Sequence, residues 1–470
     1  MRRTLLFGKI IMALLLFSCS SDDDAGEAQP FVAAFENPSV SFTAEDTDKE
    51  ITLVYSKTAT EAGTATISYT SVNAEYGTHF ITSPSGENGI LEVPLTAGSN
   101  SATFNFTKLQ NPVEGTEMSV TFKLDAVSNT NSSLQGNTTL AVSFTESAAL
   151  GGVLSPEVGG PNQPNQVYVD LSSQTQTTVK RDTWDLGFYS GEDFRVVLNG
   201  SLYMAAKELE STDIDAISEA DVTAFQSAVA VGTFSAESAD YIDDPSGNIR
   251  ETAIAEISET ASENKVYLVN LGSAIGTETP EKGGIDITDD SRGWKKIRVL
   301  RQGNDYVLQY ADLNATTHNE VVIDKNEDYN FTFFSFNTNE ETTVEPEKTK
   351  WDLNFTVFTN IIQGYGAYGY ADFVATNLKA GAKAYQVNAA DFSYENFSAE
   401  DIIEANLIED QRGIGSDWRN GGGPNTLPSL KEDVFFVLKD SDGNYYKIRF
   451  TALLSESGER GYPKFEYKLL

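Results

Sequence analysis

A long internal repeat constrains this fold more than any other feature of the sequence. "TTVKRDTWDLGF", from Thr177 to Phe188, reappears as "TTVEPEKTKWDLNF" from Thr342 to Phe355, and each copy follows a strand-like run with a polar turn. Farther along, "GWKKIRVL" at Gly293 corresponds loosely to "NYYKIRF" at Asn444. Solenoid repeats are much shorter than the stretch of chain between the two equivalent tryptophans, Trp184 and Trp351. The repeat therefore predicts a tandem pair of β-rich domains, residues 147–325 and 326–470.

Composition points to strands in the rest of the chain as well. The chain has 470 residues, which predicts two to four domains, and its hydrophobic content of 40% is that of a globular protein. Thr, Ser, Asn, Gly, Tyr, Phe and Val are abundant, and such residues favour pleated surfaces over helices. We predict a mostly β chain with a few short helices, at Ser211–Val229 and Asn396–Ile408.

Residues 30–146 alternate apolar and polar residues in many short runs separated by Gly, Asn and Pro, which is typical of a β-sandwich. "AEYGTHF" (Ala74–Phe80), "GILEVPLTAGSNSATFNF" (Gly89–Phe106) and "NTTLAVSFTE" (Asn137–Glu146) resemble a Calx-beta-like domain. Domains of that kind often have an aspartate where His79 stands. Because one imidazole without partners seldom holds a metal ion, we interpret this domain as a spacer and expect no metal there.

The first residues resemble the signal of a bacterial lipoprotein. Cationic residues precede the short apolar run Ile10–Phe17, and Leu16–Cys19 resembles a lipobox whose cysteine is acylated. Cys19 is the single cysteine of the chain. We expect a signal peptide over residues 1–18, an acidic tether over 19–29, and an outer membrane lipoprotein, lipid-anchored and exposed on the cell surface.

The charge excludes one class of partner. The formal net charge is −36, and such a field repels nucleic acid.

"GGVLSPEVGGPNQPNQ", from Gly151 to Gln166, concentrates Gly and Pro and indicates a linker. No catalytic motif stands out from the 69 acidic residues and two histidines, so we do not expect an enzyme.

The repeated unit resembles the HmuY-like family of haem-binding lipoproteins. The resemblance rests on Trp184-Asp185-Leu186 with Phe188, on Trp351-Asp352-Leu353 with Phe355, on "YYKIRF" and on the ending "GERGYPKFEYKLL". It implies two tandem all-β HmuY-like domains that capture haem or a related tetrapyrrole and pass it to an outer-membrane haem receptor. It also implies two axial ligands, His or Met, on loops near the strand after the Trp-Asp pair.

Two side chains are the candidates for those axial ligands. Met204 follows Asn199-Gly200, in the segment where the family places a ligand, and His318 lies in a polar turn. The alternative is a methionine that fills a gap in the core and a histidine on an exposed turn.

Aromatic residues near glycines offer a second kind of contact. Tyr203, Tyr365, Tyr368 and Tyr370 could stack on a flat ring or a sugar face, or could belong to ordinary β structure. A glycan-binding or adhesive surface lipoprotein without haem is therefore the alternative function. Trp351 and Phe355, four residues apart, are expected on one face of a strand, with Asp352 and Asn354 on the other.

Overall fold

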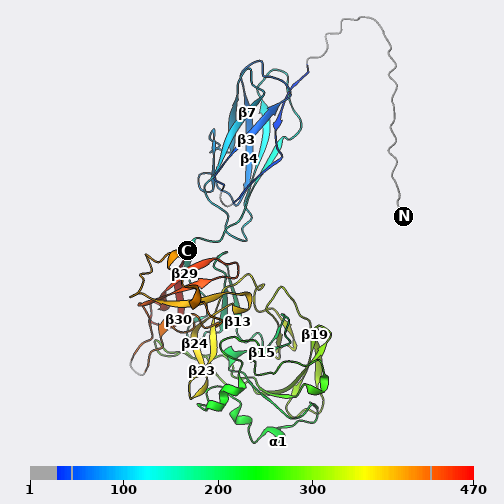
Figure 1. The fold of residues 1–470 in the computed structure, drawn as a ribbon, viewed down its shortest axis with the longest axis vertical. Coiled ribbons are helices and arrows are strands. Elements are labelled where there is room, and N and C mark those ends of the chain that lie inside the picture. Colours follow the sequence, from blue (N-terminus) through cyan, green and yellow to red (C-terminus); the bar gives the residue numbers. More distant parts are fainter. Residues whose placement is uncertain (1–28, 44–45, 424–425) are drawn as a thin grey trace, which may run out of the picture. The chain divides into compact units, whose positions relative to one another are not determined.

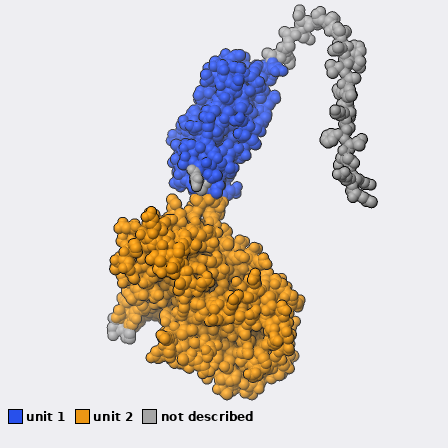
Figure 2. Space-filling view, in the orientation of Figure 1, with its two compact units in different colours: residues 1–112, 117–145 blue, residues 113–116, 146–470 orange. Residues whose placement is uncertain are grey.

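The structure is a computed structural model that describes residues 29–43, 46–423 and 426–470. The chain divides into two compact units, residues 1–112 with 117–145 and residues 113–116 with 146–470 (Figure 2). The predicted signal peptide, Cys19 and the tether up to residue 28 lie outside the described residues. The mostly β prediction is confirmed, since strands dominate both units (Figure 1).

The first unit is a β-sandwich of two five-stranded sheets. Along β6, residues 90–95, exposed and buried side chains alternate, as a strand with one wet face requires. The buried faces meet in a phenylalanine-rich core in which the rings of Phe80 and Phe106 stack at 5.1 Å. The sheets have the orders β5 (Phe80–Ser83), β7 (Ser101–Lys108), β3 (Asp48–Tyr55), β1 (Phe31–Phe35), β9 (Ser132–Leu134) and β2 (Ser39–Phe42), β10 (Thr139–Phe144), β8 (Ser119–Val127), β4 (Gly63–Val72), β6 (Ile90–Leu95).

His79 stabilises a turn in this sandwich. Its Nδ1 accepts a hydrogen bond from the backbone N–H of Glu75 at 3.0 Å, and its own backbone N–H donates to the carbonyl of Glu75 at 2.9 Å.

The second unit contains four main sheets, two with four strands and two with five. The four-stranded sheets are β13 (Gln176–Lys180), β12 (Asn165–Val169), β23 (Leu353–Ile362), β24 (Gly366–Thr376) and β15 (Val196–Leu198), β14 (Leu186–Tyr189), β21 (Phe331–Ser335), β22 (Glu340–Thr342). The five-stranded sheets are β16 (Ala205–Glu208), β17 (Tyr267–Asn270), β18 (Trp294–Gln302), β19 (Asp305–Asp312), β20 (Asn319–Ile323) and β25 (Lys383–Asn388), β28 (Val434–Lys439), β29 (Tyr445–Leu454), β30 (Arg460–Leu469), β11 (Gly151–Leu154).

The two sequence copies exchange strands. β12 of the first copy pairs with β23 of the second, and the corresponding strand β21 of the second copy pairs with β14 of the first. The five-stranded sheets are built alike, with β11 at the edge beside β30 and β20 at the equivalent edge beside β19. Of these two edge strands, β11 crosses from residues 147–325 to the sheet of the second copy, whereas β20 lies within residues 147–325. In Figure 1, β29 and β30 lie on one side of this unit and β19 on the other. The repeat therefore folds as one interlocked body.

The repeated tryptophans make equivalent contacts. Trp351 packs edge to face on Tyr168 of β12 with ring centroids 4.9 Å apart, and Trp184 packs on Phe333 of β21 at 4.8 Å. Trp351 is buried and Trp184 half-buried. Each tryptophan thus joins the strand that follows it to the strand received from the other copy.

The aspartate of each motif fixes the same crossing. An Oδ2 atom of Asp352 accepts the backbone N–H of Leu171 at 2.9 Å, and Oδ2 of Asp185 accepts that of Phe336 at 2.6 Å. Leu171 and Phe336 end the corresponding runs of the two copies. Charged acceptors make short, strong hydrogen bonds. Each aspartate therefore holds the end of the strand received from the other copy, which gives the Trp-Asp pair the same structural role in both copies.

The predicted sharing of one strand face by Trp351 and Phe355 is wrong. The strand begins only at Leu353, after a bend at Asp352, so the period of two does not extend back to the tryptophan. Phe355 belongs to the core with Leu353, whereas Trp351 packs against Tyr168.

Two local predictions also need correction. The predicted linker is built into the fold, because β11 pairs with β30 and Gly461 approaches the backbone of Gly160 so closely that a Cβ would meet it at 2.1 Å. The predicted helices are short turns: the first range holds α1 (Glu219–Val222) and a 3₁₀ turn at Gln226–Ala228, and the second holds 3₁₀ turns at Ala399–Asp401 and Glu404–Asn406. A serine capping box begins the first turn of each range. Among the described residues, no helix has the length and apolar character needed to cross a membrane.

Candidate ligand pocket

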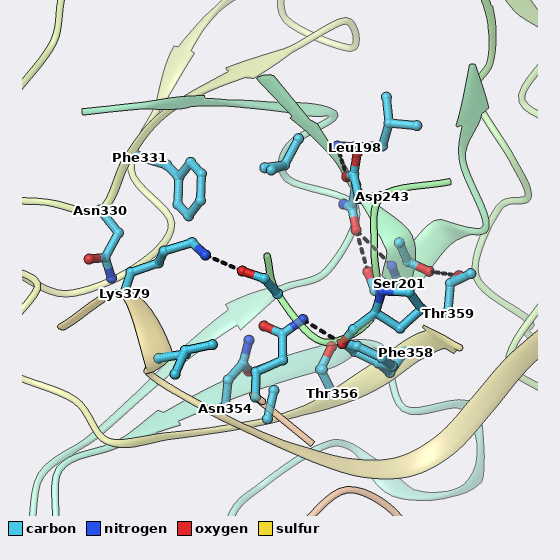
Figure 3. Close-up of a pocket in the computed structure, with 18 of the residues that line it drawn as sticks. Leu198, Ser201, Asp243, Asn330, Phe331, Asn354, Thr356, Phe358, Thr359 and Lys379 are labelled. Atoms are coloured by element: carbon cyan, nitrogen blue, oxygen red, sulfur yellow. Dashed lines mark hydrogen bonds between the residues drawn. The ribbon is translucent and has the colours of Figure 1, made fainter. Parts of the chain in front are cut away.

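A cavity of about 210 Å³ lies where the two four-stranded sheets of the second unit meet. Both repeated tryptophans line it, together with side chains of β12, β21 and β23 and the segment from Ile242 to Thr252. Figure 3 shows Asp243 and Leu198 on one side of the cavity, with Phe331 and Lys379 on the other. The pocket is therefore made jointly by the two copies.

The alternation of side chains along β23 places some of them in the pocket wall and others in the core. Asn354, Thr356 and Phe358 line the pocket, while their neighbours Leu353 and Phe355 enter the core on the opposite face. Figure 3 shows the three lining residues along one edge of the cavity. Here the same strand that starts with the Trp-Asp motif supplies both the core and the pocket wall.

Two asparagines close the ends of the pocket in equivalent ways. The side-chain amide of Asn199 donates to the carbonyl of Trp184 at 2.8 Å, and that of Asn377 donates to the carbonyl of Trp351 at 2.8 Å. Each asparagine also caps a short 3₁₀ turn, at Gly200–Leu202 and Leu378–Ala380. The tryptophans are thus held in place by hydrogen bonds as well as by packing.

Three ionisable side chains in the wall have shifted pKa values, and desolvation is the main cause for each. Burial raises the pKa of Glu345 to about 8 and that of Asp243 to about 6, and it lowers the pKa of Lys379 to about 8. Glu345 is thus mostly protonated at neutral pH. The wall accordingly carries less charge than its composition suggests.

The segment between Asp243 and Gly247 covers one side of the pocket and is held by hydrogen bonds. The Asp243 carboxylate accepts the backbone N–H groups of Leu198 at 2.7 Å and Ala253 at 2.9 Å. Lys379 donates to the carbonyl of Gly247. These contacts tie the covering segment to both copies (Figure 3).

Four buried polar atoms in residues that line the pocket have no hydrogen-bond partner among the described residues. They are the indole Nε1 atoms of Trp184 and Trp351, Oδ1 of Asn354 and Oγ1 of Thr376. Buried polar groups are nearly always paired, so a concentration of exceptions in one place needs an explanation. A bound polar group or water in the pocket would supply the partners.

Met204 and His318 are not brought together by the structure. Met204 lines the pocket with only 1% of its surface exposed. His318 lies just before β20, with Nδ1 3.0 Å from Oδ1 of Asp215. Met204 precedes β16, and β16 and β20 are opposite edges of one five-stranded sheet, about 19 Å apart by four inter-strand spacings. His318 is not among the residues that line the pocket.

The four tyrosines lie outside the pocket lining. Tyr203 packs over the backbone of Gly369, where a Cβ would meet its ring at about 2 Å. Tyr365 and Tyr368 are 58% and 38% exposed on the β23–β24 hairpin, and Tyr370 contacts Tyr368 at 5.7 Å. Tyr365, Tyr368 and Tyr370 thus belong to the β23–β24 hairpin, whereas Tyr203 packs with Ile287, Val357 and Ala371.

The sequence interpretation missed Glu345, Asp243 and Lys379, which carry the ionisable chemistry of the pocket. No sequence signal separates them from the other acids and lysines. The two capping asparagines also have no spacing signal, because Asn199 lies 15 residues after Trp184 and Asn377 lies 26 residues after Trp351. Their equivalence is visible only in the structure.

Comparisons with known proteins show the family. A search of the curated proteins finds none that matches. Solved structures that match include the apo form of the Calx CBD1 domain (13% identity, 25% of this chain and all of that one, TM-score 0.21) and a two-domain protein of unknown function from Bacteroides fragilis (9% identity, 65% and 90%, TM-score 0.19). The HmuY protein family model matches residues 162–314 and 327–467. The chain therefore belongs to the HmuY family, a family of non-enzymatic haem-binding proteins that are bacterial surface lipoproteins.

Proposed function

We propose that this protein is a surface-anchored outer-membrane lipoprotein that captures haem, or a related planar tetrapyrrole, in the pocket between its two copies and delivers it to an outer-membrane receptor. The observation that carries the proposal is the position of Met204, which lines an aromatic cavity. Thioethers are among the side chains that ligate haem iron. Family membership supports the same ligand class.

The pocket fits a haem in part. Phe331, Phe358 and the two tryptophans provide flat apolar walls, and Met204 would supply one donor to the iron. No histidine lines the cavity, so His318 is not part of the proposed site and the iron would have one ligand from the protein. The cavity is also smaller than the roughly 300–1,000 Å³ of ordinary ligand sites. Haem would therefore have to displace the segment around Asp243 and Gly247.

Replacing Met204 by leucine is expected to abolish the haem spectrum with little change in packing, because the two side chains have similar volumes. The wild type should shift the Soret band on titration with haem under reducing conditions, since a thioether prefers ferrous iron. Met118→Leu, in the core of the first unit, is the matched control and should bind as the wild type does. An unchanged Soret shift in Met204→Leu would reject Met204 as the ligand, and no shift in the wild type in either redox state would reject haem binding.

The second candidate function is binding of a glycan without haem, and the exposed hairpin favours it. Tyr365 and Tyr368 are accessible, and Phe234, itself 63% exposed, lies 5.8 Å from the Tyr368 ring. Exposed aromatic faces suit the apolar faces of sugars. Retardation in gels that contain neutral polysaccharide, lost in Tyr365→Ala/Tyr368→Ala, would support this function over haem capture.

Cys19→Ala is expected to release the protein from the membrane fraction. The prediction follows from the lipobox-like run and the single cysteine, since acylation of Cys19 would be the anchor. Fractionation of cells that express each form, with immunodetection of the first unit, measures it. Membrane association that survives the substitution would contradict lipid anchoring through Cys19.

A further inference from the structure

The unpaired polar atoms of the pocket residues are uncharged and include both donors and acceptors of hydrogen bonds. The indole N–H groups of Trp184 and Trp351 can only donate, Oδ1 of Asn354 accepts, and the hydroxyl of Thr376 can do either. Trp351 and Thr376 are only 8% and 2% exposed, so neither side chain is open to bulk solvent. A ligand that pairs with such atoms removes the cost of leaving them unsatisfied.

The charged side chains of the pocket wall, in contrast, already have partners. Lys379 donates to a backbone carbonyl, and the Asp243 carboxylate accepts two backbone N–H groups. The Asp244 carboxylate accepts the hydroxyl of Ser246. Burial raises the pKa of Glu345 to about 8, so its carboxyl group is mostly neutral at pH 7. The groups that remain free for a ligand therefore favour an uncharged molecule, because a buried charge without a partner is costly.

The apolar walls of the pocket are flat and held in place by packing. Phe358 stacks on Phe373 with ring centroids 4.0 Å apart and planes at 3° to each other. Phe331, Trp184 and Trp351 belong to one hydrophobic cluster. Aromatic faces favour a planar partner, and walls that are ordered before binding lower its entropic cost.

The volume of the cavity limits the size of the ligand. About 210 Å³ is available while the segment between Asp243 and Gly247 covers the pocket (Figure 3). An apolar cavity of about 150 Å³ is large enough to hold a benzene molecule. The covered pocket therefore has room for one or two fused rings, whereas haem would have to displace the covering segment.

We propose that the pocket, with this segment in place, binds a small neutral heterocycle of one or two rings that both donates and accepts hydrogen bonds, as a lactam or a nucleobase does. A carbonyl oxygen of the ligand accepts an indole N–H, and a ring N–H donates to Oδ1 of Asn354. The inference goes beyond haem capture and does not depend on it. Because the small ligand favours the covered pocket and haem the uncovered one, each lowers the apparent affinity of the other.

Calorimetric titration of the full chain with uracil and with hypoxanthine tests the proposal, since these one-ring and two-ring probes carry both N–H and carbonyl groups. At least one probe is expected to bind and to raise the melting temperature of the protein. N-methylated forms of the same probes keep the carbonyl groups but lack the N–H donors. They are expected to bind about tenfold more weakly, because they leave a buried oxygen without a partner. The proposal is overturned if neither probe binds, or if the methylated forms bind as tightly.

Two pocket variants locate the bound probe. Trp351→Phe keeps an aromatic wall but removes one N–H donor, and Asn354→Leu removes an acceptor; each is expected to weaken binding about tenfold. Trp294→Phe is the matched control, since Trp294 is not among the residues that line the pocket. Thermal melts without ligand show whether each variant is folded. If both pocket variants bind the probe as the wild type does, the probe lies elsewhere and the proposal fails.

Titration with haem separates this proposal from the proposed function. A saturating concentration of the bound probe is expected to weaken the Soret shift of the wild type. An undiminished shift would mean that probe and haem do not compete, which overturns the placement of the probe in this pocket. A wild type without any Soret shift rejects haem capture alone, and calorimetry then decides the small-ligand proposal.

Discussion

Asp372→Ala is expected to destabilise the second unit by about 3–5 kcal/mol, the usual cost of leaving a buried charge without its partner. The Asp372 carboxylate lies 2.5 Å from Nε of Arg460 and 3.7 Å from Arg419. Gln163 donates to its other oxygen at 2.6 Å. Both arginines are more than nine-tenths buried, so the substitution strands two cations and an amide.

Equilibrium unfolding in urea, followed by tryptophan fluorescence, measures this effect. Asp372→Asn should cost less, because asparagine accepts the hydrogen bond of Gln163 and tolerates the positive φ of 51° at this position, although the charge is lost. Asp417→Ala, which removes an exposed carboxylate 3.5 Å from Lys431, should stay within about 0.5 kcal/mol of the wild type. Equal unfolding midpoints for the Asp372 and Asp417 variants would contradict the assigned role.

The sequence was sufficient to predict the duplication but not the exchange of strands. Motif similarity identifies β12 with β21 and β14 with β23, and the structure confirms that these strands have equivalent neighbours. Whether β12 pairs with the WD strand of its own copy or of the other copy cannot be read from residue types, because either pairing buries the same faces. The choice depends on how the intervening chain packs.

The pocket shows the same limit at the level of single residues. Met204 was identified because it follows a motif, and motifs are local. Glu345 and Asp243 have shifted pKa values only because several distant elements exclude water from them, and that burial leaves no trace in sequence. His318 was selected by residue type alone, and the sheet order places it at the edge opposite Met204.

Arg292→Met is expected to lower the free energy of unfolding by about 3–5 kcal/mol. The substitution leaves the fully buried Asp185 without the cation with which it is paired. The double variant Asp185→Asn/Arg292→Met should recover much of this loss, since neither side chain then carries a charge. The asparagine still accepts the backbone N–H of Phe336, so the strand crossing keeps its hydrogen bond. Urea unfolding of the two single variants and the double variant gives the coupling between the two positions.

Removing the charge of the equivalent aspartate in the second copy, Asp352, should raise the free energy of unfolding at neutral pH. Asp352→Asn removes a carboxyl group that is 3% exposed and whose pKa is raised by burial in the folded protein. Such a group binds its proton more tightly when folded, so it lowers stability as the pH rises above the ordinary carboxyl pKa of about 4. The variant should therefore be more stable than the wild type at neutral pH, by a margin that vanishes below about pH 4. If Asp352→Asn and Asp185→Asn instead lose stability to the same extent, the two aspartates have equivalent surroundings and the ion pair of Asp185 with Arg292 does not distinguish them.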